Sequence, residues 1–431
     1  MSPPPPFREG DDPNVSESVA APPPAETRGV GARLARKEDD RFLAGKGRYV
    51  GDIRLAGMLE LAFLRSPVAH GILRGAQKPA GHEDAVFLAA DLAVDTARMH
   101  DALSAYEAGH SRETYRALMA AAEPQRQELI RRLNQVAGAT SLLVGMRADL
   151  LRLAGDDPEL AALDVDFRHL FSSWFNRGFL VLRPISWESP AHILEKIIAY
   201  EAVHTIESWS DLRRRLEPAD RRCFAFFHPA MPDDPLIFVE VALTAGVPGS
   251  IQELLAEDRT PLDPADTDAA VFYSISNCQA GLAGISFGNS LIKQVAADLS
   301  AAVPGLKTFV TLSPIPGLCR WIEAQGLTVP AEATEIRRVA GRYLMSAKRA
   351  DGQPLDPVAR FHLGNGAIIL QLHADGDTSD KGLAQSAGAM VNYLYDLSNV
   401  AQNQERYAAH REIAASLDVR SLLAAADKVR A

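Results

Sequence analysis

Cysteine is scarce in this sequence, and long apolar runs do not occur. Only three of the 431 residues are cysteine, namely Cys223, Cys278 and Cys319, and none of them forms a CxxC pair. The spacing gives no sign of a disulfide framework or a zinc site, and it is typical of a reducing compartment. Since no run of about 18 apolar residues occurs and the N-terminus is acidic and proline-rich, we expect a cytoplasmic protein with no membrane partner.

An excess of positive charge is also missing. Lys and Arg together number 45 against 55 Asp and Glu, so the formal net charge is −10. This balance disfavours a surface that binds a polyanion over the whole molecule, and we expect no nucleic-acid partner. The composition, with 47% hydrophobic and 23% charged residues, is that of a globular protein long enough for two domains.

Changes in composition divide the chain into four segments. Residues 1–30 are rich in proline and predict a disordered tail, and residues 31–83 contain short alternating runs that predict a strand-and-turn segment of unclear role. Residues 84–178 carry apolar side chains at three- and four-residue steps, which predicts an all-α helical bundle domain. Its expected helices are Leu88–His110, Glu113–Gln135 and Ala139–Leu153.

The last segment, residues 179–431, alternates between β-branched or aromatic runs and amphipathic stretches. This pattern predicts a mixed α/β domain, so the fold class expected for the chain is α+β or α/β with a preceding helical domain. The expected strands are Phe179–Leu182, Cys223–Phe227, Leu236–Leu243, Ala270–Ser276, Thr308–Ser313 and Ala367–Leu372. The expected helices are Ala191–Val203, Asn289–Ala302, Gly317–Gln325, Glu335–Met345 and Gln385–Leu394.

A glycine-rich turn lies between one expected strand and the next helix. Gly281, Gly284 and Gly288 follow the strand, and a helix is expected to open at Asn289 or Ser290. Such a turn directs unpaired backbone N–H groups and a positive helix end at one point, which suits a pyrophosphate. An ordinary β–α turn that needs glycine for its backbone conformation explains the spacing equally well. The spacing matches neither the P-loop nor the dinucleotide fingerprint.

Two further windows contain candidate catalytic side chains. The strand ending at Ser313 is interrupted by Pro314 and Pro316, so the hydroxyl lies at the edge of the sheet where α/β domains bind ligands. The alternative is that Ser313 only opens a turn. His362 lies between Phe361 and Leu363 just before a turn, where an imidazole can be part-buried and act near neutral pH. A structural histidine is the alternative.

Other polar groups have a functional and a structural interpretation. Arg213–Arg215 with Arg221 and Arg222 can bind a phosphate group, or they can form a solvated helix face. Glu240 can be a general base on a strand or a structural carboxylate. Cys278 is favoured as a small packed residue over a nucleophile, because no base is assigned to it.

Seven motifs, in their order along the chain, resemble those of the malonyl-CoA decarboxylase family. The resemblance extends from about Ala105 to Leu423. The motifs are Phe171–Leu180, Tyr200–His204, Arg221–Phe224, Phe272–Ser276, Thr311–Gly317, Phe361–Ala367 and Asn392–Tyr395.

The resemblance implies an acetyltransferase-like (GNAT-like) catalytic domain that converts malonyl-CoA to acetyl-CoA and CO2 without a metal or organic cofactor. It implies Ser313 and His362 as the catalytic pair, with Tyr395 beside them, and Ser274 in the acyl pocket together with Tyr395. It also implies a homo-oligomer, a dimer or tetramer. The residues implied in the CoA pyrophosphate turn are Ala283, Gly284, Ile285, Ser286, Phe287, Gly288 and Asn289.

The chain departs from this family pattern at two places. Some members carry a glutamate in the turn where this chain has Ser286. The family's Arg-x-Asn-Trp-like run before the late Asp-x-Ser motif is replaced by Gln371–Ser379, so we expect altered packing under the active-site loop.

The segment Gly31–Arg74 resembles a different family, because it is similar to the start of the large subunit of molybdenum hydroxylases. Its motifs are Arg36–Ile53, Gly57–Leu59 and Arg65–His70. The later segments that build the molybdopterin site in those enzymes are not found here, so this resemblance implies no redox function.

Two other functions compete with decarboxylation. An acyl-CoA N-acyltransferase would share the fold and the pyrophosphate turn, and it would release free CoA thiol. A non-catalytic acyl-CoA sensor would bind malonyl-CoA without turnover. The order of Ser313 and His362, each in its family motif, favours the enzyme.

Overall fold

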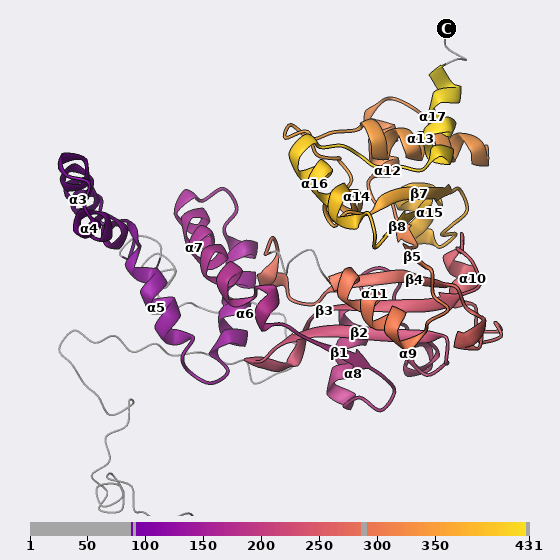
Figure 1. The fold of residues 1–431 in the computed structure, drawn as a ribbon, viewed down its shortest axis with the longest axis horizontal. Coiled ribbons are helices and arrows are strands. Elements are labelled where there is room, and N and C mark those ends of the chain that lie inside the picture. The colour runs from indigo at the N-terminus through magenta and orange to yellow at the C-terminus, as the bar shows by residue number, and fades with distance from the viewer. Residues whose placement is uncertain (1–87, 89–91, 286–290, 428–431) are drawn as a thin grey trace, which may run out of the picture. The chain divides into compact units, whose positions relative to one another are not determined.

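The computed structural model describes residue 88 and residues 92–285 and 291–427. These residues belong to one unit, Gln77–Ala431. The expected disordered tail, residues 1–30, and nearly all of the segment before the helical domain lie outside the described residues. Within them the expected fold class is confirmed, because a helical region precedes a mixed α/β sheet domain (Figure 1).

In the described residues the helical region contains five helices, which are α3 (Thr96–Ala108), α4 (Arg112–Ala122), α5 (Gln125–Leu133), α6 (Ala139–Leu153) and α7 (Pro158–Trp174). The predicted helix 139–153 is confirmed. The predicted helix 113–135 is wrong in its length, because Pro124 precedes α5 with an extended backbone and divides the stretch in two. Helix α7 begins with Asp157 accepting backbone hydrogen bonds and with Pro158 in its first turn, a favourable start.

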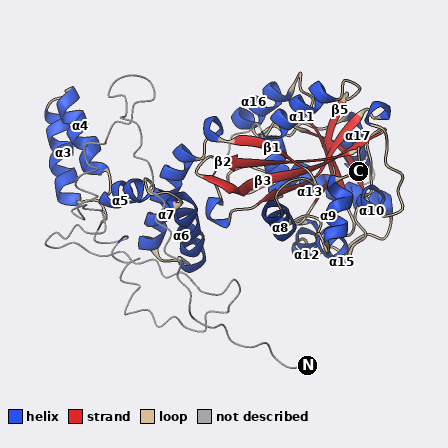
Figure 2. Cartoon of the chain, turned by 90° about the horizontal axis from the view of Figure 1, so that it is seen from below, coloured by secondary structure: helices blue, strands red, loops and turns tan. Residues whose placement is uncertain are grey.

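The mixed domain is built on one eight-stranded sheet, drawn in red in Figure 2. Its strand order is β1-β2-β3-β4-β5-β8-β6, and β7 also pairs with β8. The predicted strands are recovered with shifted ends. The strands are β1 (Val181–Ile185), β2 (Arg221–His228), β3 (Met231–Thr244), β4 (Ala269–Asn277), β5 (Thr308–Thr311), β6 (Ser313–Pro314), β7 (Ile368–His373) and β8 (Met390–Leu394).

Within the part of the chain that the structure describes, ten α-helices accompany this sheet. They are α8 (Ala191–Tyr200), α9 (Trp209–Leu216), α10 (Ile251–Leu255), α11 (Leu291–Ala302), α12 (Leu318–Ala324), α13 (Ala333–Ser346), α14 (Pro357–Gly364), α15 (Asp380–Ser386), α16 (Val400–His410) and α17 (Leu417–Asp427). Short 3₁₀ turns lie at η3 (Arg177–Phe179), η4 (Pro264–Asp266) and η5 (Ala280–Leu282).

The prediction of a helix over Gln385–Leu394 is wrong. Helix α15 ends at Ser386, and Ala387 and Gly388 both take a positive φ, 52° and 79°, which turns the chain out of the helix. Met390–Leu394 then forms β8, which lies between β5 and β7 in the pairing. Its residues are nearly all buried, and a short apolar run of this kind cannot be told from a buried helix by periodicity.

The sheet opens between β4 and β5. These strands pair in parallel from Ala269 with Thr308 to Phe272 with Thr311. Beyond Phe272, β4 continues to Asn277, whereas β5 has ended. The two strands therefore diverge, and among the described residues no strand pairs with the part of β4 after Phe272 on its β5 side.

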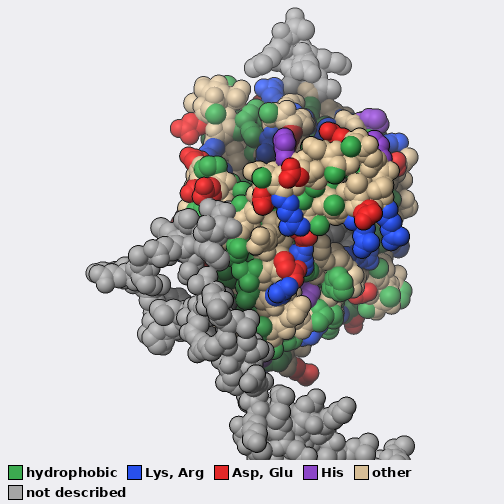
Figure 3. All heavy atoms as spheres, turned by 90° about the vertical axis from the view of Figure 1, so that its left-hand side faces the viewer, with side chains coloured by type: hydrophobic (Ala, Val, Ile, Leu, Met, Phe, Trp, Pro, Cys, Tyr) green, Lys and Arg blue, Asp and Glu red, His purple; other side chains and the backbone are tan. Residues whose placement is uncertain are grey.

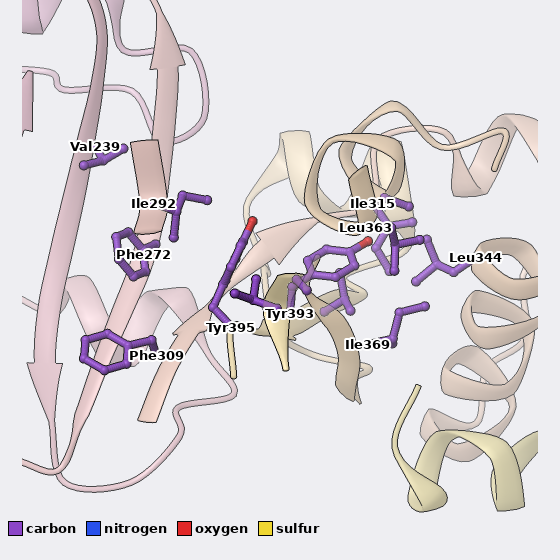
Figure 4. Packing of buried hydrophobic residues seen from close by; sticks show 14 of the residues in the cluster. Val239, Phe272, Ile292, Phe309, Ile315, Leu344, Leu363, Ile369, Tyr393 and Tyr395 are labelled. Carbon is purple, nitrogen blue, oxygen red and sulfur yellow. The ribbon is translucent and has the colours of Figure 1, made fainter. Parts of the chain in front are cut away.

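Buried side chains connect the two sides of this opening. Figure 4 shows Tyr393 on β8 and Tyr395 just after its end, between an apolar group around Phe272 and a second group around Leu363. Both tyrosine side chains are at most 1% exposed. Burying aromatic side chains of this size stabilises a core strongly, so β8 joins the halves of the domain.

The helical region packs onto the sheet domain through the glycine-rich turn. Leu282 and Ile285 belong to the same apolar core as Val144 of α6. The Arg147 side chain, also on α6 and 1% exposed, donates hydrogen bonds to the carbonyl oxygens of Gly281 and Ala283 at 2.7 and 2.9 Å. Its Nε atom donates to Asp164 at 2.7 Å. A buried charge with three such acceptors is well satisfied, so Arg147 fixes the turn to α6.

The visible surface carries both signs of charge. On the face shown in Figure 3, basic and acidic side chains are interspersed with uncharged ones. Among the described helices, none has the length and apolar character needed to cross a membrane.

We expect Gly281→Ala to destabilise the protein. A Cβ atom at this position would lie 1.8 Å from the carbonyl oxygen of Val144, so either α6 or the turn must shift. Overpacking of this kind costs about 1–3 kcal/mol, seen as a lower melting temperature. The control is Gly145→Ala on α6, where a Cβ meets no atom within 4 Å and alanine favours the helix. Equal melting temperatures for wild type and Gly281→Ala would contradict this packing.

Candidate active site

A cavity of about 240 Å³ lies at the opening between β4 and β5. Its walls come from the end of β4, from β6, from the start and last turn of α14 and from the loop after α8. Most of the lining is apolar, and Ser313, His362 and Asn277 contribute polar groups. The lining residues are Val203, Ile237, Phe272, Tyr273, Ile275, Asn277, Ser313, Pro314, Pro357, Val358, Phe361 and His362.

The structure brings Ser313, His362 and Tyr395 together from three elements. The Oγ atom of Ser313 lies 3.3 Å from Nε2 of His362, and Nδ1 of His362 lies 2.8 Å from the hydroxyl oxygen of Tyr395. Ser313 and His362 line the cavity, and Tyr395 is held behind the imidazole. All three side chains are buried. The predicted trio thus forms one hydrogen-bonded chain.

Thr311 and Tyr393 hold this hydrogen-bonded trio in place. The Ser313 hydroxyl donates to Oγ1 of Thr311 at 2.8 Å, and the same oxygen accepts the backbone N–H of Tyr393 at 3.1 Å. The Tyr393 ring stacks on the imidazole of His362 with 4.5 Å between ring centroids. Neither residue was predicted to act here, although both lie within family motifs.

His362 is presented by the last turn of α14. Asp356 caps this helix by accepting the backbone N–H of Ala359 at 2.8 Å, and Pro357 occupies the first turn. Burial raises the pKa of Asp356 to about 6. The helix was missed at the sequence level, although an aspartate followed by proline is a recognisable helix start. A helix predicted to start at Pro357 would have placed His362 about one and a half turns after its first residue.

Burial also controls the charge of the imidazole. It lowers the pKa of His362 to about 3, so the ring is neutral at neutral pH when the cavity is empty. Because Ser313 donates to Thr311, its oxygen is free to accept the Nε2–H of His362, and Nδ1 accepts from Tyr395. Burial raises the pKa of Tyr395 well above its usual value, which keeps this donor protonated.

Ser274 is buried on β4 and does not line the cavity. Its hydroxyl lies 2.8 and 2.7 Å from the two carboxylate oxygens of Glu201 and donates to this group. Glu201 was not predicted as a site residue, although it stands in the Tyr200–His204 motif. The predicted role of Ser274 in the acyl pocket stays a prediction, and its contact is with a neighbouring side chain.

Only part of the predicted pyrophosphate turn is described. Ala283 and Gly284 are exposed and Ile285 is buried, whereas Ser286, Phe287, Gly288 and Asn289 lie outside the described residues. Gly284 has a φ of 74°, a conformation that favours glycine. The Arg168 guanidinium of α7 lies 3.8 Å from the position a Cβ atom would take at Gly284.

The remaining candidates are engaged in structural contacts. Arg215 is buried and pairs with Glu240 at 3.3 Å and with Asp211 at 3.1 Å. Arg213 pairs with the exposed Glu217 at 2.7 Å. Burial raises the pKa of both Glu240 and Cys278, which disfavours a thiolate at the latter. In the described part of the chain, no group of three or more His, Cys, Asp or Glu could hold a metal ion.

Comparison with known proteins identifies relatives of most of the chain. The malonyl-CoA decarboxylase N-terminal domain matches residues 92–175, and the C-terminal domain of the same family matches residues 178–335 and 329–431. The mitochondrial malonyl-CoA decarboxylase of Anser anser anser is 35% identical over 353 residues, which are 70% of this chain and 69% of that protein. The crystal structure of malonyl-CoA decarboxylase from Rhodopseudomonas palustris is 47% identical, has a TM-score of 0.74, and the match covers 80% of this chain and 91% of that one.

The N-terminal segment has a different and short match. The carbon monoxide dehydrogenase large chain of Hydrogenophaga pseudoflava is 46% identical over 52 residues, which are 12% of this chain and only 6% of that protein. So small a share of a large enzyme carries no activity with it.

The neutral imidazole predicts how stability depends on pH. Because the pKa of His362 falls from 6.5 in the unfolded chain to about 3 in the folded one, the unfolded chain binds more protons between these values. The free energy of unfolding therefore falls as the pH drops below 6.5, by about 1.4 kcal/mol per pH unit from this group. We expect a shallower fall in His362→Gln, measured by urea denaturation between about pH 6.5 and 5. Parallel curves for the two proteins would contradict a buried neutral His362.

Proposed function

This chain belongs to the malonyl-CoA decarboxylase family and is a carboxy-lyase of that family, and we propose that Ser313, His362 and Tyr395 are the residues with which it converts malonyl-CoA to acetyl-CoA and CO2. One observation carries the assignment. The three side chains form a continuous hydrogen-bonded chain at the wall of a largely apolar cavity where β4 and β5 diverge.

The substrate itself supplies the electron sink for this reaction. When the bond between the carboxylate and the α-carbon breaks, CO2 leaves and the electron pair is delocalised onto the thioester oxygen as an enolate. The protein must orient the carboxylate, stabilise the enolate oxygen and deliver one proton to the α-carbon. We propose that it does so with no metal and no organic cofactor.

His362 is the proposed proton donor. The ring is neutral in the free enzyme, and a malonyl carboxylate placed beside Nε2 raises the pKa of the imidazole, so a proton is taken up with the substrate. The protonated ring then gives this proton to the α-carbon and returns to its neutral form. The Tyr395 hydroxyl can donate to Nδ1 of the neutral ring and accept Nδ1–H from the protonated ring, so it serves both states.

Ser313 is the proposed partner of the thioester or enolate oxygen. Its hydroxyl donates to Thr311 in the free enzyme, and a small rotation of its side chain directs it into the cavity that it lines. The apolar walls formed by Phe272, Ile275 and Val358 exclude water from the carbanion and strengthen these few polar contacts.

The CoA portion is proposed to leave the cavity along the unpaired part of β4. Backbone groups between Tyr273 and Asn277 lack a β5 partner and can bind the amides of the pantetheine arm, as an added strand would. The exposed Ala283–Gly284 part of the turn is proposed to receive the pyrophosphate.

A cytoplasmic location and a homo-oligomer, a dimer or tetramer, are also proposed. The three cysteines are free thiols, which fits a reducing compartment. Cell fractionation tests the location, which differs from the mitochondrial location in the name of the goose relative. Light scattering during size exclusion measures the oligomeric state.

The proposed reaction predicts acetyl-CoA and CO2 in equal amounts when purified protein is incubated with malonyl-CoA. Mass spectrometry measures the acetyl-CoA, and trapping measures the CO2. We expect unchanged rates after treatment with EDTA. Loss of activity with EDTA, restored by a metal ion, would contradict the metal-free mechanism.

The competing functions give different products in the same assay. Release of CoA thiol, detected with DTNB in the presence of an amine, would indicate an N-acyltransferase. Binding of malonyl-CoA by folded protein without acetyl-CoA would indicate a sensor. Either result would overturn the proposed reaction.

Substitutions separate the three proposed catalytic roles. We expect His362→Asn to lower kcat by about 10²- to 10⁴-fold, the usual contribution of an oriented general acid. We expect Ser313→Ala to lower kcat by about 10²- to 10³-fold, as for loss of an oxyanion donor, and Tyr395→Phe by about tenfold, as for one hydrogen bond. The control is His192→Asn, whose side chain is 52% exposed. A kcat near wild type in His362→Asn or Ser313→Ala would refute the role of that residue.

A further inference from the structure

One wall of the catalytic cavity is a short loop with no regular structure. Val203 lines the cavity together with Ser313 and His362, and it lies in the loop that follows α8. Neither Val203 nor its neighbour Ala202 belongs to a helix or a strand. The position of this wall must therefore come from contacts of its backbone with other parts of the protein.

The first anchor of the loop is Glu201. One of its carboxylate oxygens accepts the backbone N–H groups of Val203 and His204, both at 2.8 Å. The same carboxylate accepts the hydroxyl of Ser274 on β4. Ser276, also on β4, accepts the backbone N–H of Ala202 at 3.2 Å. Glu201 therefore ties the loop to β4, the strand that forms one edge of the opening.

The second anchor is Lys381, which comes from a distant part of the chain. Its Nζ atom donates to the carbonyl oxygens of Ala202 and Val203 at 2.7 and 3.0 Å. Lys381 lies in the first turn of α15, which Ser379 caps by accepting the N–H of Gly382 at 3.1 Å. The loop thus has its N–H groups bound on one side and its carbonyl groups bound on the other.

We propose that Glu201 and Lys381 are positioning residues that hold Val203 as a rigid wall, and that this wall limits the size of the group on the α-carbon of the malonyl substrate. Ser274 acts through Glu201. The inference rests on the proposed function, because it assigns the cavity beside Ser313 and His362 to the malonyl group.

The physical reason is that rejecting one extra methyl group requires a wall that cannot move. A cavity that excludes a methyl by contact discriminates by about 10- to 200-fold. A loop held only by its own backbone would yield to the larger substrate at small cost. Two sets of charge-assisted hydrogen bonds, one from a carboxylate and one from an ammonium group, make that movement costly.

The test is a competition between malonyl-CoA and methylmalonyl-CoA in one tube. With the two substrates at equal concentration, the ratio of propionyl-CoA to acetyl-CoA formed at early times equals the ratio of the two kcat/KM values, whatever fraction of the protein is active. We expect Lys381→Met and Glu201→Ala to raise this ratio by about three- to tenfold, part of the discrimination that one methyl provides. Mass spectrometry measures both products.

Matched variants separate positioning from general damage. Lys196→Met removes a lysine that also binds a carbonyl group and a carboxylate, those of Asp233 and Asp234, away from the cavity, and it should leave the ratio unchanged. Glu201→Gln keeps an oxygen that accepts two N–H groups, so it should restore a ratio near that of wild type. A change confined to stability would lower the yield of both products equally.

The experiment distinguishes failure of the proposed function from failure of the positioning role of Glu201 and Lys381. If wild-type protein makes no acetyl-CoA from malonyl-CoA, the proposed function fails. If wild type is active and Lys381→Met keeps the wild-type ratio, the positioning role fails while the function stands. Because Lys381 is exposed, this variant is expected to fold even where Glu201→Ala does not.

Discussion

The end of the parallel pairing between β4 and β5 is the constraint on which the site depends. Four residue pairs join these strands, and after Phe272 and Thr311 the pairing stops. A sheet interior does not leave backbone groups unpaired unless a ligand or another segment can reach them. The opening therefore creates a cavity, and the backbone of β4 after Phe272 lies at its edge without β5 beside it. Ser313 lies at this point because β6 begins where β5 has ended.

The surrounding core converts this opening into a chemical site. Tyr393 on β8 and Tyr395 just after its end enclose the imidazole of His362. The Tyr393 ring stacks on the imidazole, and the Tyr395 hydroxyl is hydrogen-bonded to it. The same burial that keeps the ring neutral also strengthens any interaction with a bound carboxylate, because little water screens it. Burial of His362 thus explains both why the imidazole is neutral without substrate and why its pKa would rise strongly when a carboxylate binds beside it.

Local signals made part of this site predictable from the sequence. The sequence placed Ser313 near the end of a strand, and the glycine turn followed from residue type alone. The predicted reason was wrong, because β5 already ends at Thr311, and Ser313 and Pro314 form β6, which pairs with β8. The nature of β8 could not be predicted, because a positive φ at Ala387 is a tertiary feature that residue type does not announce. The contact between Glu201 and Ser274 joins positions 73 residues apart, and no periodicity in one sequence reports it.

The contacts that were missed share a physical character. Arg147 binds carbonyl groups of the glycine-rich turn, and Lys381 binds those of the loop that carries Val203. In both contacts a charged side chain meets backbone carbonyl groups far away in the chain. A carbonyl group exists at every residue, so the acceptor leaves no mark in the sequence, and the donor resembles any surface cation. Side chains that act on substrate can be recognised by type and neighbourhood, whereas side chains that hold a backbone in place become visible only when the fold supplies their partners. The sequence therefore revealed the reacting groups of this site more readily than the groups that position its walls.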